Sequence, residues 1–484
     1  MHYNAPQRRW IGVVQVARNM TRNRLTRREV LRYGAYTGLG AGLLGSLPLG
    51  GCRNSRGEKR PNILLITLDT TRRDRLGCYG CARATSPNLD ALAGESVVYD
   101  QATAPSNWTL PSHASLFTGK FTTSHGARYD AEGPLCLKGH LAGPDTFWSH
   151  FRARGLSPDE VTLASMLRQA GYATAAVAAG PWLKRAFGLD KGFQFYDDSQ
   201  ISTLNGRRAA QVTYAALEWL RQLRDETFFV FVNYFDPHEP YRPPGGFARR
   251  FLRPGTRING NDTSDLAIRE QRDLYDAEVL YMDYHIGHLI NELKRMARYD
   301  STWIIVASDH GEMLGEHARV GHGHRLYQQE IHIPMFVKYP KGEIAPSRTS
   351  VPVQLTDVMP MILHRLGTSP PADIQGGLPP SVGHPIVAEI YPLEFLRDDG
   401  NSRAILEDNF KYVWNAKGSH ALYNLADDPH EQTNLLDDQA ERARAMDGRL
   451  NTYLASLPRP DESGPPQIVD EQTQRALRSL GYTE

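Results

Sequence analysis

The chain has 484 residues, of which 40% are hydrophobic and 23% charged, and its formal net charge is +1 at pH 7. This length suits one large α/β domain with a smaller one, each with enough apolar residues for a core. The balanced charge excludes the strong basic excess typical of nucleic-acid-binding proteins, so we expect no nucleic-acid partner. Four cysteines are too few for a disulfide scaffold in a chain this long.

The first 52 residues have the pattern of an export signal. A twin-arginine pair, Arg27 and Arg28, precedes an apolar, glycine-rich stretch over 34–51 that ends at Leu49-Gly50-Gly51-Cys52. Glycine and proline interrupt this stretch too often for a stable membrane helix, whereas a secretory signal tolerates them. We predict a signal segment over 1–52, lipidation of Cys52, and export to the periplasm or cell envelope, with the lipid as the only membrane attachment. The alternative is a cytoplasmic protein with an irregular N-terminus.

Three short apolar segments end in acidic or histidine residues. The segment PNILLITLD ends at Asp69, TFFVFVNYFD at Asp236, and STWIIVASDH at Asp309 and His310. Each is predicted to be a buried parallel strand, and ligands bind at the carboxyl ends of such strands in open α/β sheets. A single Asp after a strand is often a helix N-cap, but three such ends together favour a functional site.

Helical patterns alternate with these strands. Residues 161–179 read as an amphipathic helix stopped at Gly171 and followed by a strand, and 271–298 as a long helix packed on the core. The alternation predicts an α/β fold with a doubly wound, mostly parallel sheet flanked by helices. The segment 133–155 reads as an inserted loop in which Phe147, Trp148 and His150 shape a pocket.

The composition changes after Gly367, where a proline- and glycine-rich stretch begins. Beyond it, 402–415 and 420–429 read as antiparallel strands and 431–457 as a helix. We therefore predict a catalytic domain over 61–368, a smaller antiparallel subdomain over 385–457, and a polar tail over 458–484 that contains a short helix.

The segment NWTLPSHASLFTG, residues 107–119, contains a candidate nucleophile. Pro111 favours a helix start, which places Thr109 at the first turn, where backbone N–H groups stabilise an anion. The pKa of a threonine hydroxyl is too high for unaided attack, so a nearby metal ion would be needed to activate it. This stretch alone favours the simpler interpretation of Thr109 as a helix N-cap.

The rest of the sequence supplies groups that bind metals. Asp69, Asp309 and His310 offer the carboxylate and imidazole ligands of a divalent cation. The segment DPHEPY follows the second predicted strand, and four histidines lie within residues 310–324. Histidines spaced by glycine on a loop are typical of metal ligands or of donors to an oxyanion.

Five segments, in this order, resemble the sulfatase family within the alkaline-phosphatase-like superfamily. They are NILLITLDTTRRDRLGCYG, NWTLPSHASLFTG, DPHEPY, SDHGEMLGEH and LYNLADDPHEQTNL, and the resemblance extends over about residues 61–457. It implies a doubly wound sheet with a metal at its C-terminal edge and a C-terminal antiparallel subdomain.

The chain departs from the family pattern at the nucleophile. Family sulfatases oxidise the Cys or Ser of a Cys/Ser-x-Pro-x-Arg motif to formylglycine, whereas this chain has Thr109-Leu110-Pro111-Ser112-His113. Threonine cannot be oxidised to that aldehyde, so we expect no formylglycine. Compared with the family pattern, His113 replaces the arginine, Thr70 the second acid of an Asp-Asp pair, and His322 a substrate-binding lysine.

These changes resemble the Thr-nucleophile phosphodiesterases and transferases of the superfamily, and the resemblance implies the following roles. The metal ligands are Asp69, Thr109, Asp309 and His310. The catalytic residues are Thr109, His113, His238 and His322. A second metal, or the substrate oxyanion, is expected at Asp236, His238, His322 and His324. Histidine-rich ligation favours zinc or manganese, with calcium as a further option.

The sequence thus predicts an exported, metal-dependent hydrolase of sulfate or phosphate esters. Thr109 favours cleavage of phosphodiesters, other phosphate esters or phosphonate esters, and transfer to an acceptor hydroxyl is an additional possibility. The first alternative is a true sulfuric ester hydrolase that works without formylglycine. The second, of another class, is a non-catalytic protein that binds anions or glycans. The expected ligand is a small, glycan-linked or lipid-linked anionic ester, and the oligomeric state cannot be inferred from the sequence.

Overall fold

The computed structural model describes residues 60–460, except 131–132, 134, 137–151, 202–205, 253–264, 380–382, 393–395 and 397–398. The predicted signal segment with Cys52 and the predicted tail helix therefore lie outside the described residues, as do Phe147, Trp148 and His150. Of the predicted loop 133–155, the described ends contain two short strands, β4 (Leu135–Cys136) and β5 (Arg152–Arg154). β5 pairs with β4 on one side and with β3 (Arg128–Tyr129) on the other.

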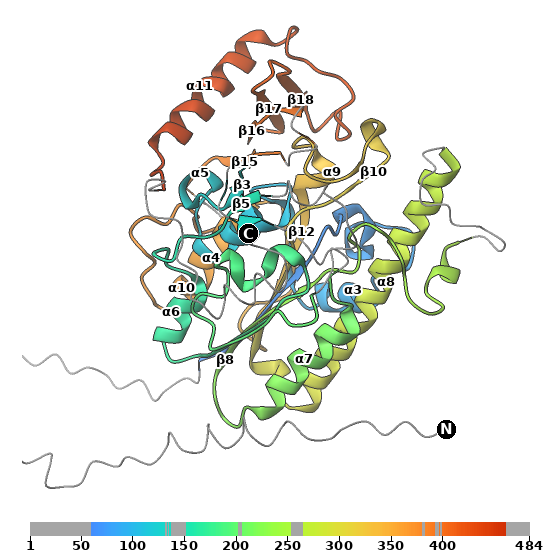
Figure 1. Ribbon diagram of the computed structural model, residues 1–484, viewed down its shortest axis with the longest axis vertical. Coiled ribbons are helices and arrows are strands. Elements are labelled where there is room, and N and C mark those ends of the chain that lie inside the picture. The colour runs from blue at the N-terminus through green and yellow to red at the C-terminus, as the bar shows by residue number, and fades with distance from the viewer. Residues whose placement is uncertain are drawn as a thin grey trace, which may run out of the picture. The chain divides into compact units, whose positions relative to one another are not determined.

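A large, mainly parallel sheet lies at the centre of the described chain (Figure 1). Its strands are β1 (Asn62–Leu68), β2 (Val97–Thr103), β6 (Ala173–Val177), β7 (Phe195–Asp197), β8 (Phe228–Tyr234), β9 (Thr302–Ser308), β12 (His332–Lys338), β13 (Ser347–Thr349) and β14 (Val353–Gln354). They are ordered β13-β2-β12-β9-β1-β8-β6-β7, with β14 also paired to β2. Only β12 runs antiparallel to its neighbours, β9 and β2, among these pairings. The predicted sheet is confirmed.

Helices cover both faces of this sheet, which is why its central strands are apolar throughout. The helices on one face are α4 (Thr109–Thr118), α6 (Leu163–Gln169) and α10 (Val358–Arg365), and those on the other are α3 (Pro87–Ala93), α7 (Ala209–Gln222) and α8 (Asp265–Arg295). In β1, Ile63 and Leu65 pack into the first core, while Leu64 and Ile66 pack into the second. Alternate side chains point to opposite faces, so both sets are buried.

The strand register sets the position of the functional residues. Leu68 of β1 lies opposite Tyr234 of β8 on one side and Ser308 of β9 on the other. The three strands therefore end at the same level, and the residues that follow them emerge together at the carboxyl edge of the sheet.

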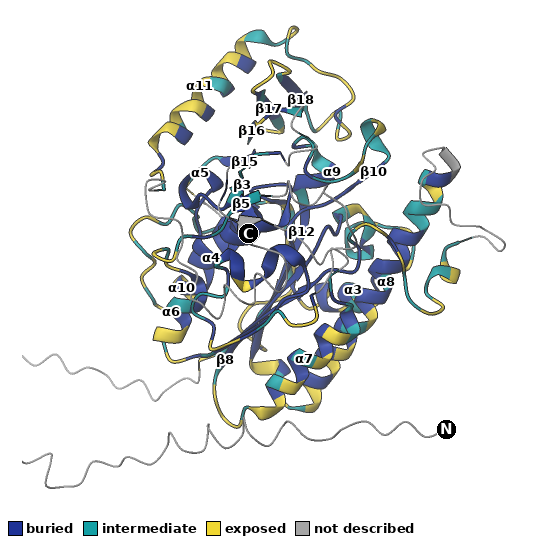
Figure 2. Cartoon of the chain, in the orientation of Figure 1, coloured by how far each residue is buried: buried dark blue, intermediate teal, exposed yellow. Residues whose placement is uncertain are grey.

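A smaller antiparallel sheet follows, as predicted. It contains β15 (Ile386–Ile390), β16 (Ser402–Glu407), β17 (Phe410–Asn415) and β18 (Ala421–Asn424), in that order, and α11 (Ala440–Ser456) packs on it. Figure 2 shows α11 with a buried inner face and an exposed outer one. The predicted start of this helix at residue 431 was wrong, because Glu431 has a left-handed backbone (φ 58°) that a helix does not accept. None of the described helices is both long and apolar enough to cross a membrane.

Candidate active site

Two carboxylates and one imidazole meet at the carboxyl edge of the sheet. Asp69, Asp309 and His310 are fully buried, and one ligand atom from each lies within 4.8 Å of the others. Both oxygens of Asp69 and Oδ2 of Asp309 have no hydrogen-bond partner among the described residues. Buried carboxylates without partners are costly unless a cation compensates them. The three residues therefore fit a divalent metal ion.

Burial also changes the protonation of this group. It raises the pKa of Asp69 well above its ordinary value, and the nearby Asp309 adds to the effect. It raises the pKa of Asp309 to about 8, although that carboxylate accepts hydrogen bonds from the backbone N–H of Thr70 (3.2 Å) and of His310 (2.8 Å). A bound cation would lower the pKa of both Asp69 and Asp309, because it favours the charged form of each acid.

Thr109 is the first residue of α4, and its hydroxyl lies next to the metal-ligand group. Its Oγ1 is 3.4 Å from Nε2 of His310, and the residue is 1% exposed. The Ser112 hydroxyl, on the same first turns, donates a hydrogen bond to the backbone oxygen of Asp309 (2.6 Å). This bond ties the start of the helix to the end of β9. Thr109 therefore has the position of a nucleophile on a helix N-terminus.

His113 lies behind Thr109 and beside one member of the metal-ligand group, with Nδ1 3.6 Å from Oδ2 of Asp309. Its Nδ1 donates to the backbone oxygen of Thr109 (2.9 Å), and its Nε2 accepts from the Thr67 hydroxyl (3.0 Å). Burial lowers the pKa of the ring to about 4, so it is neutral at pH 7. Both ring nitrogens of His113 are thus engaged in hydrogen bonds within the protein. His113 therefore supports the backbone at Thr109 and has no free nitrogen with which to contact a substrate.

His238 and His322 lie together on another side of the metal-ligand group. The ring centroid of His322 is 4.6 Å from that of His310 and 4.9 Å from that of His238. Burial lowers the pKa of each of the two to about 4. The Nδ1 of His238 donates to the backbone oxygen of Glu239, and that of His310 to the oxygen of Gly311. In both rings Nε2 therefore keeps its lone pair for a ligand.

Glu312 is a buried acid of this site that the sequence reasoning did not single out. Its Oε1 accepts from Nδ1 of His322 (3.2 Å), and burial raises its pKa to about 7. The hairpin of β10 (Met313–Leu314) and β11 (Val320–Gly321) pairs Met313 with Gly321, which brings the two neighbouring residues together. The available signal was an acid two residues after the Asp-His pair, but nine residues separate Glu312 from His322, so the sequence did not indicate their contact.

The four residues predicted for a second metal are not brought together. Asp236 accepts from the backbone N–H of Ala209 at the start of α7 (3.1 Å), which is the capping role open to any acid after a strand. His324 contacts Arg319 (3.0 Å) and Asp399 (3.5 Å). Only His238 and His322 of the predicted four lie beside the metal-ligand group.

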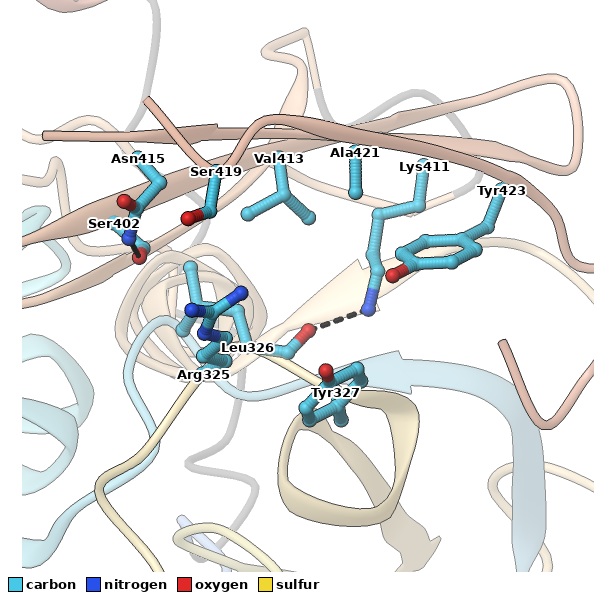
Figure 3. A pocket seen from close by; sticks show the side chains of 10 residues that line it. All are labelled: Arg325, Leu326, Tyr327, Ser402, Lys411, Val413, Asn415, Ser419, Ala421 and Tyr423. Carbon is cyan, nitrogen blue, oxygen red and sulfur yellow. Dashed lines mark hydrogen bonds between the residues drawn. The ribbon is translucent and has the colours of Figure 1, made fainter. Parts of the chain in front are cut away.

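The C-terminal subdomain holds the loop that carries His322. Lys411 of β17 and Glu431 are both fully buried and form an ion pair, and Lys411 also donates to the backbone oxygen of Leu326 (Figure 3). Glu431 accepts from the backbone N–H of Gln328, at the start of α9 (Gln328–Ile331), at 2.6 Å. The late DPHEQTNL segment, which contains Glu431, therefore fixes the loop.

We expect Glu431→Gln to destabilise the protein by about 3–5 kcal/mol, because it leaves the Lys411 charge buried without its partner. The matched control is Glu407→Gln, which breaks the exposed pair with Arg449 (2.6 Å) in the same subdomain and should cost about 1 kcal/mol or less. Urea unfolding of both variants measures the difference. Equal midpoints for the two variants would show that the buried pair does not hold the loop.

Comparison with known proteins agrees with this geometry. The sulfatase family model matches residues 61–368. An uncharacterised sulfatase of Escherichia coli, YidJ, is 27% identical over 427 residues, which cover 78% of this chain and 83% of that protein.

Two solved structures share the fold, each with a TM-score of 0.65 and 20% identity over 82% of this chain. The first is a protein solved in complex with its substrate, D-glucosamine-2-N,6-O-disulfate, and the match covers 97% of that protein. The other is the phosphonate monoester hydrolase of Agrobacterium radiobacter, covered over 96%. The matched family, the sheet and the group at its edge together show that this chain belongs to the sulfatase family.

Proposed function

We propose that this sulfatase-family hydrolase cleaves anionic esters with Thr109 as its nucleophile, and that it prefers phosphodiesters, other phosphate esters or phosphonate esters to sulfate esters. The observation that carries the proposal is the Thr109 hydroxyl, whose oxygen lies 3.4 Å from Nε2 of His310 and next to the buried Asp69 and Asp309, three of whose carboxylate oxygens have no hydrogen-bond partner among the described residues. A divalent cation held by Asp69, Asp309 and His310 would acidify that hydroxyl and polarise the ester. Zinc or manganese suits a ligand set that includes histidine.

The residues of the chain then have distinct tasks. The Thr109 oxygen attacks phosphorus or sulfur and its proton passes to water, while the bond to the leaving oxygen breaks and that oxygen takes up a proton from water to depart as an alcohol. The Nδ1–H groups of His238 and His322 are donated within the protein, so either ring would hydrogen-bond an oxygen of the transferred group only when its Nε2 carries a proton, and Glu312 orients His322. Water, or an acceptor hydroxyl, then attacks the phospho- or sulfo-threonyl group and regenerates Thr109.

The family relationship supports either transferred group. One structural neighbour hydrolyses phosphonate monoesters, and another is seen with a disulfated sugar. We propose a small or glycan-linked anionic ester as the substrate, with a lipid-linked ester as the alternative. We also propose, from the twin-arginine pattern and Cys52, that the enzyme is exported and lipid-anchored.

The deciding experiment compares turnover of the metal-loaded protein on matched aryl esters: a sulfate, a phosphate monoester, a phosphate diester and a phosphonate monoester. Thr109→Ala is the blank. We expect a phosphorus ester to have the highest kcat/KM, by tenfold or more over the sulfate. A preference for the sulfate would mean that the chain is a true sulfatase without formylglycine, and binding of the esters without any turnover would support the non-catalytic alternative.

A further inference from the structure

A pocket lies between the loop that follows His322 and the C-terminal sheet (Figure 3). Arg325, Leu326 and Tyr327 form one wall, and strands β16, β17 and β18 with the turn after β17 form the other. Figure 3 shows the Arg325 guanidinium directed toward Ser402, Asn415 and Ser419, while Tyr423 lies at the opposite end, beside Lys411. The pocket therefore has one polar end and one partly aromatic end.

Three basic side chains gather around one carboxylate at the polar end. Asp399 accepts two hydrogen bonds from Arg319 (2.8 Å each), and the same carboxylate is the ion-pair partner of His324 (3.5 Å) and of Arg325 (3.7 Å). One carboxylate thus serves three basic side chains. At the other end, Lys411 is neutralised by Glu431.

Arg325 has hydrogen-bonding capacity that the described residues do not use. Its Nε is buried without a hydrogen-bond partner there, and its contact with Asp399 is longer than a hydrogen bond. On the facing strands, the Asn415 side chain donates to the Ser402 hydroxyl (2.8 Å) and to the backbone oxygen of Asp399 (2.7 Å), which fixes this polar edge. The Asn415 amide donors are therefore already used, and the unpartnered Nε of Arg325 is the donor that suits an oxyanion.

The pocket adjoins the active site through a short stretch of chain. The Asn107 side chain, two residues before Thr109, reaches the backbone oxygen of Arg325 (3.5 Å). The loop that carries Arg325 also carries His322, whose ring lies beside His310. The wall of the pocket that contains Arg325 is therefore built on the same loop as His322 and against the segment that precedes Thr109.

We propose that this pocket binds a second oxyanion, a sulfate or a carboxylate, of the same substrate whose ester is cleaved at Thr109. The inference rests on the proposed function and narrows its substrate class to esters with at least two anionic groups. Arg325 binds the second oxyanion. The apolar and aromatic end of the pocket packs against the carbon skeleton of the substrate, for example the face of a sugar ring.

The test uses the full, metal-loaded chain and two arginine variants. Arg325→Met removes the pocket cation and leaves Asp399 paired with Arg319. Arg403→Met is the matched control: Arg403 neighbours Ser402 on β16, so it points to the opposite face, where it lies over Trp414 (5.3 Å). Turnover of an aryl ester with one anionic group should be the same in the wild type and Arg403→Met, and the kcat and KM of Arg325→Met on this ester are measured as the reference for its own inhibition constant.

A fully sulfated heparin hexasaccharide is then used as an inhibitor of that turnover. We expect its inhibition constant to rise about tenfold in Arg325→Met, because that variant loses one charge-assisted contact. The inhibition constant should stay unchanged in Arg403→Met. No inhibition of the wild type, or equal inhibition of all three proteins, would overturn the proposal.

Crystals soaked in selenate provide a readout that does not need turnover. We expect one anomalous peak near Thr109 and a second beside Arg325, and only the second should disappear in Arg325→Met. A single peak near Thr109, or a pocket peak that persists in Arg325→Met, would contradict the pocket while leaving the proposed function intact. Failure of every aryl ester to turn over would instead count against the proposed function, and the selenate result would still be readable.

Discussion

Thr109→Ala should lower kcat/KM on the best ester by on the order of 10³-fold or more, because the proposed mechanism passes through a covalent intermediate on the Thr109 hydroxyl. The fold should be retained, since the His113 contact at this position is to the backbone oxygen of Thr109 and not to its side chain. Thr109→Ser, which keeps a hydroxyl, should retain most of the activity. Stopped assays of kcat/KM, thermal unfolding and metal content measure the three properties separately.

Thr118→Ala is the matched control, because it removes a hydroxyl from the other end of α4, where Oγ1 donates to the backbone oxygen of Ala114 (2.7 Å). It should leave turnover within twofold of the wild type. Intact-protein mass spectrometry of the reaction, quenched in acid, should show one added phosphoryl or sulfuryl group on the wild type and none on Thr109→Ala. If Thr109→Ala turns over at the wild-type rate, Thr109 is not the nucleophile and the mechanism has to be abandoned.

Removal of the metal should make the stability of the protein depend on pH. Burial raises the pKa of Asp69, and that of Asp309 to about 8, above the value of about 4 for an unfolded Asp. Between these values the folded, metal-free chain binds more protons than the unfolded chain, so its free energy of unfolding falls as the pH rises from about 4 to about 8. A bound cation would remove this decrease in the free energy of unfolding, so the stabilisation by added metal should be larger at pH 8 than at pH 5.

Asp309→Asn tests the assignment of the ligands. It should weaken metal binding at least about 100-fold and reduce the pH dependence of the metal-free protein, because one of the two buried acids is gone. Asp300→Asn, which affects only the exposed pair with Lys341 (3.5 Å), serves as the control. Metal analysis after dialysis and calorimetric melting at the two pH values give the result. Full metal occupancy in Asp309→Asn would show that the metal is held elsewhere.

The strand-end pattern in the sequence was sufficient to predict most of the metal-ligand group. Apolar strands that end in Asp69 and in Asp309-His310 lie in adjacent positions of the sheet, and their aligned ends bring these side chains together. The same pattern misled at Asp236, whose carboxylate caps α7 instead. Sequence reasoning could not separate the cases, because the order of strands and the start of the next helix decide which acid faces the site.

The residue contacts that could not be predicted from the sequence depend on which distant segments of the chain pair with one another. Glu312 meets His322 only because a two-stranded hairpin closes between them. His324, two residues further, has turned to Asp399, a residue more than seventy positions away in the chain. His113 was expected to replace an arginine at the substrate, but its helical position lets Nδ1 reach the oxygen of Thr109 one turn earlier.

The buried pair of Lys411 and Glu431 also separates two parts of the site along the chain: the metal-ligating residues and the contacts that hold the loop with His322. All three metal-ligating groups lie within residues 69–310, whereas the loop with His322 is fixed by contacts from residues 411 and 431. A chain that ended after His310 would contain all three of these residues but not Lys411 and Glu431, the partners that set the histidine loop. The residues that fit the cation are thus encoded in the first two thirds of the chain, and the contacts that hold the loop beside them in the last fifth.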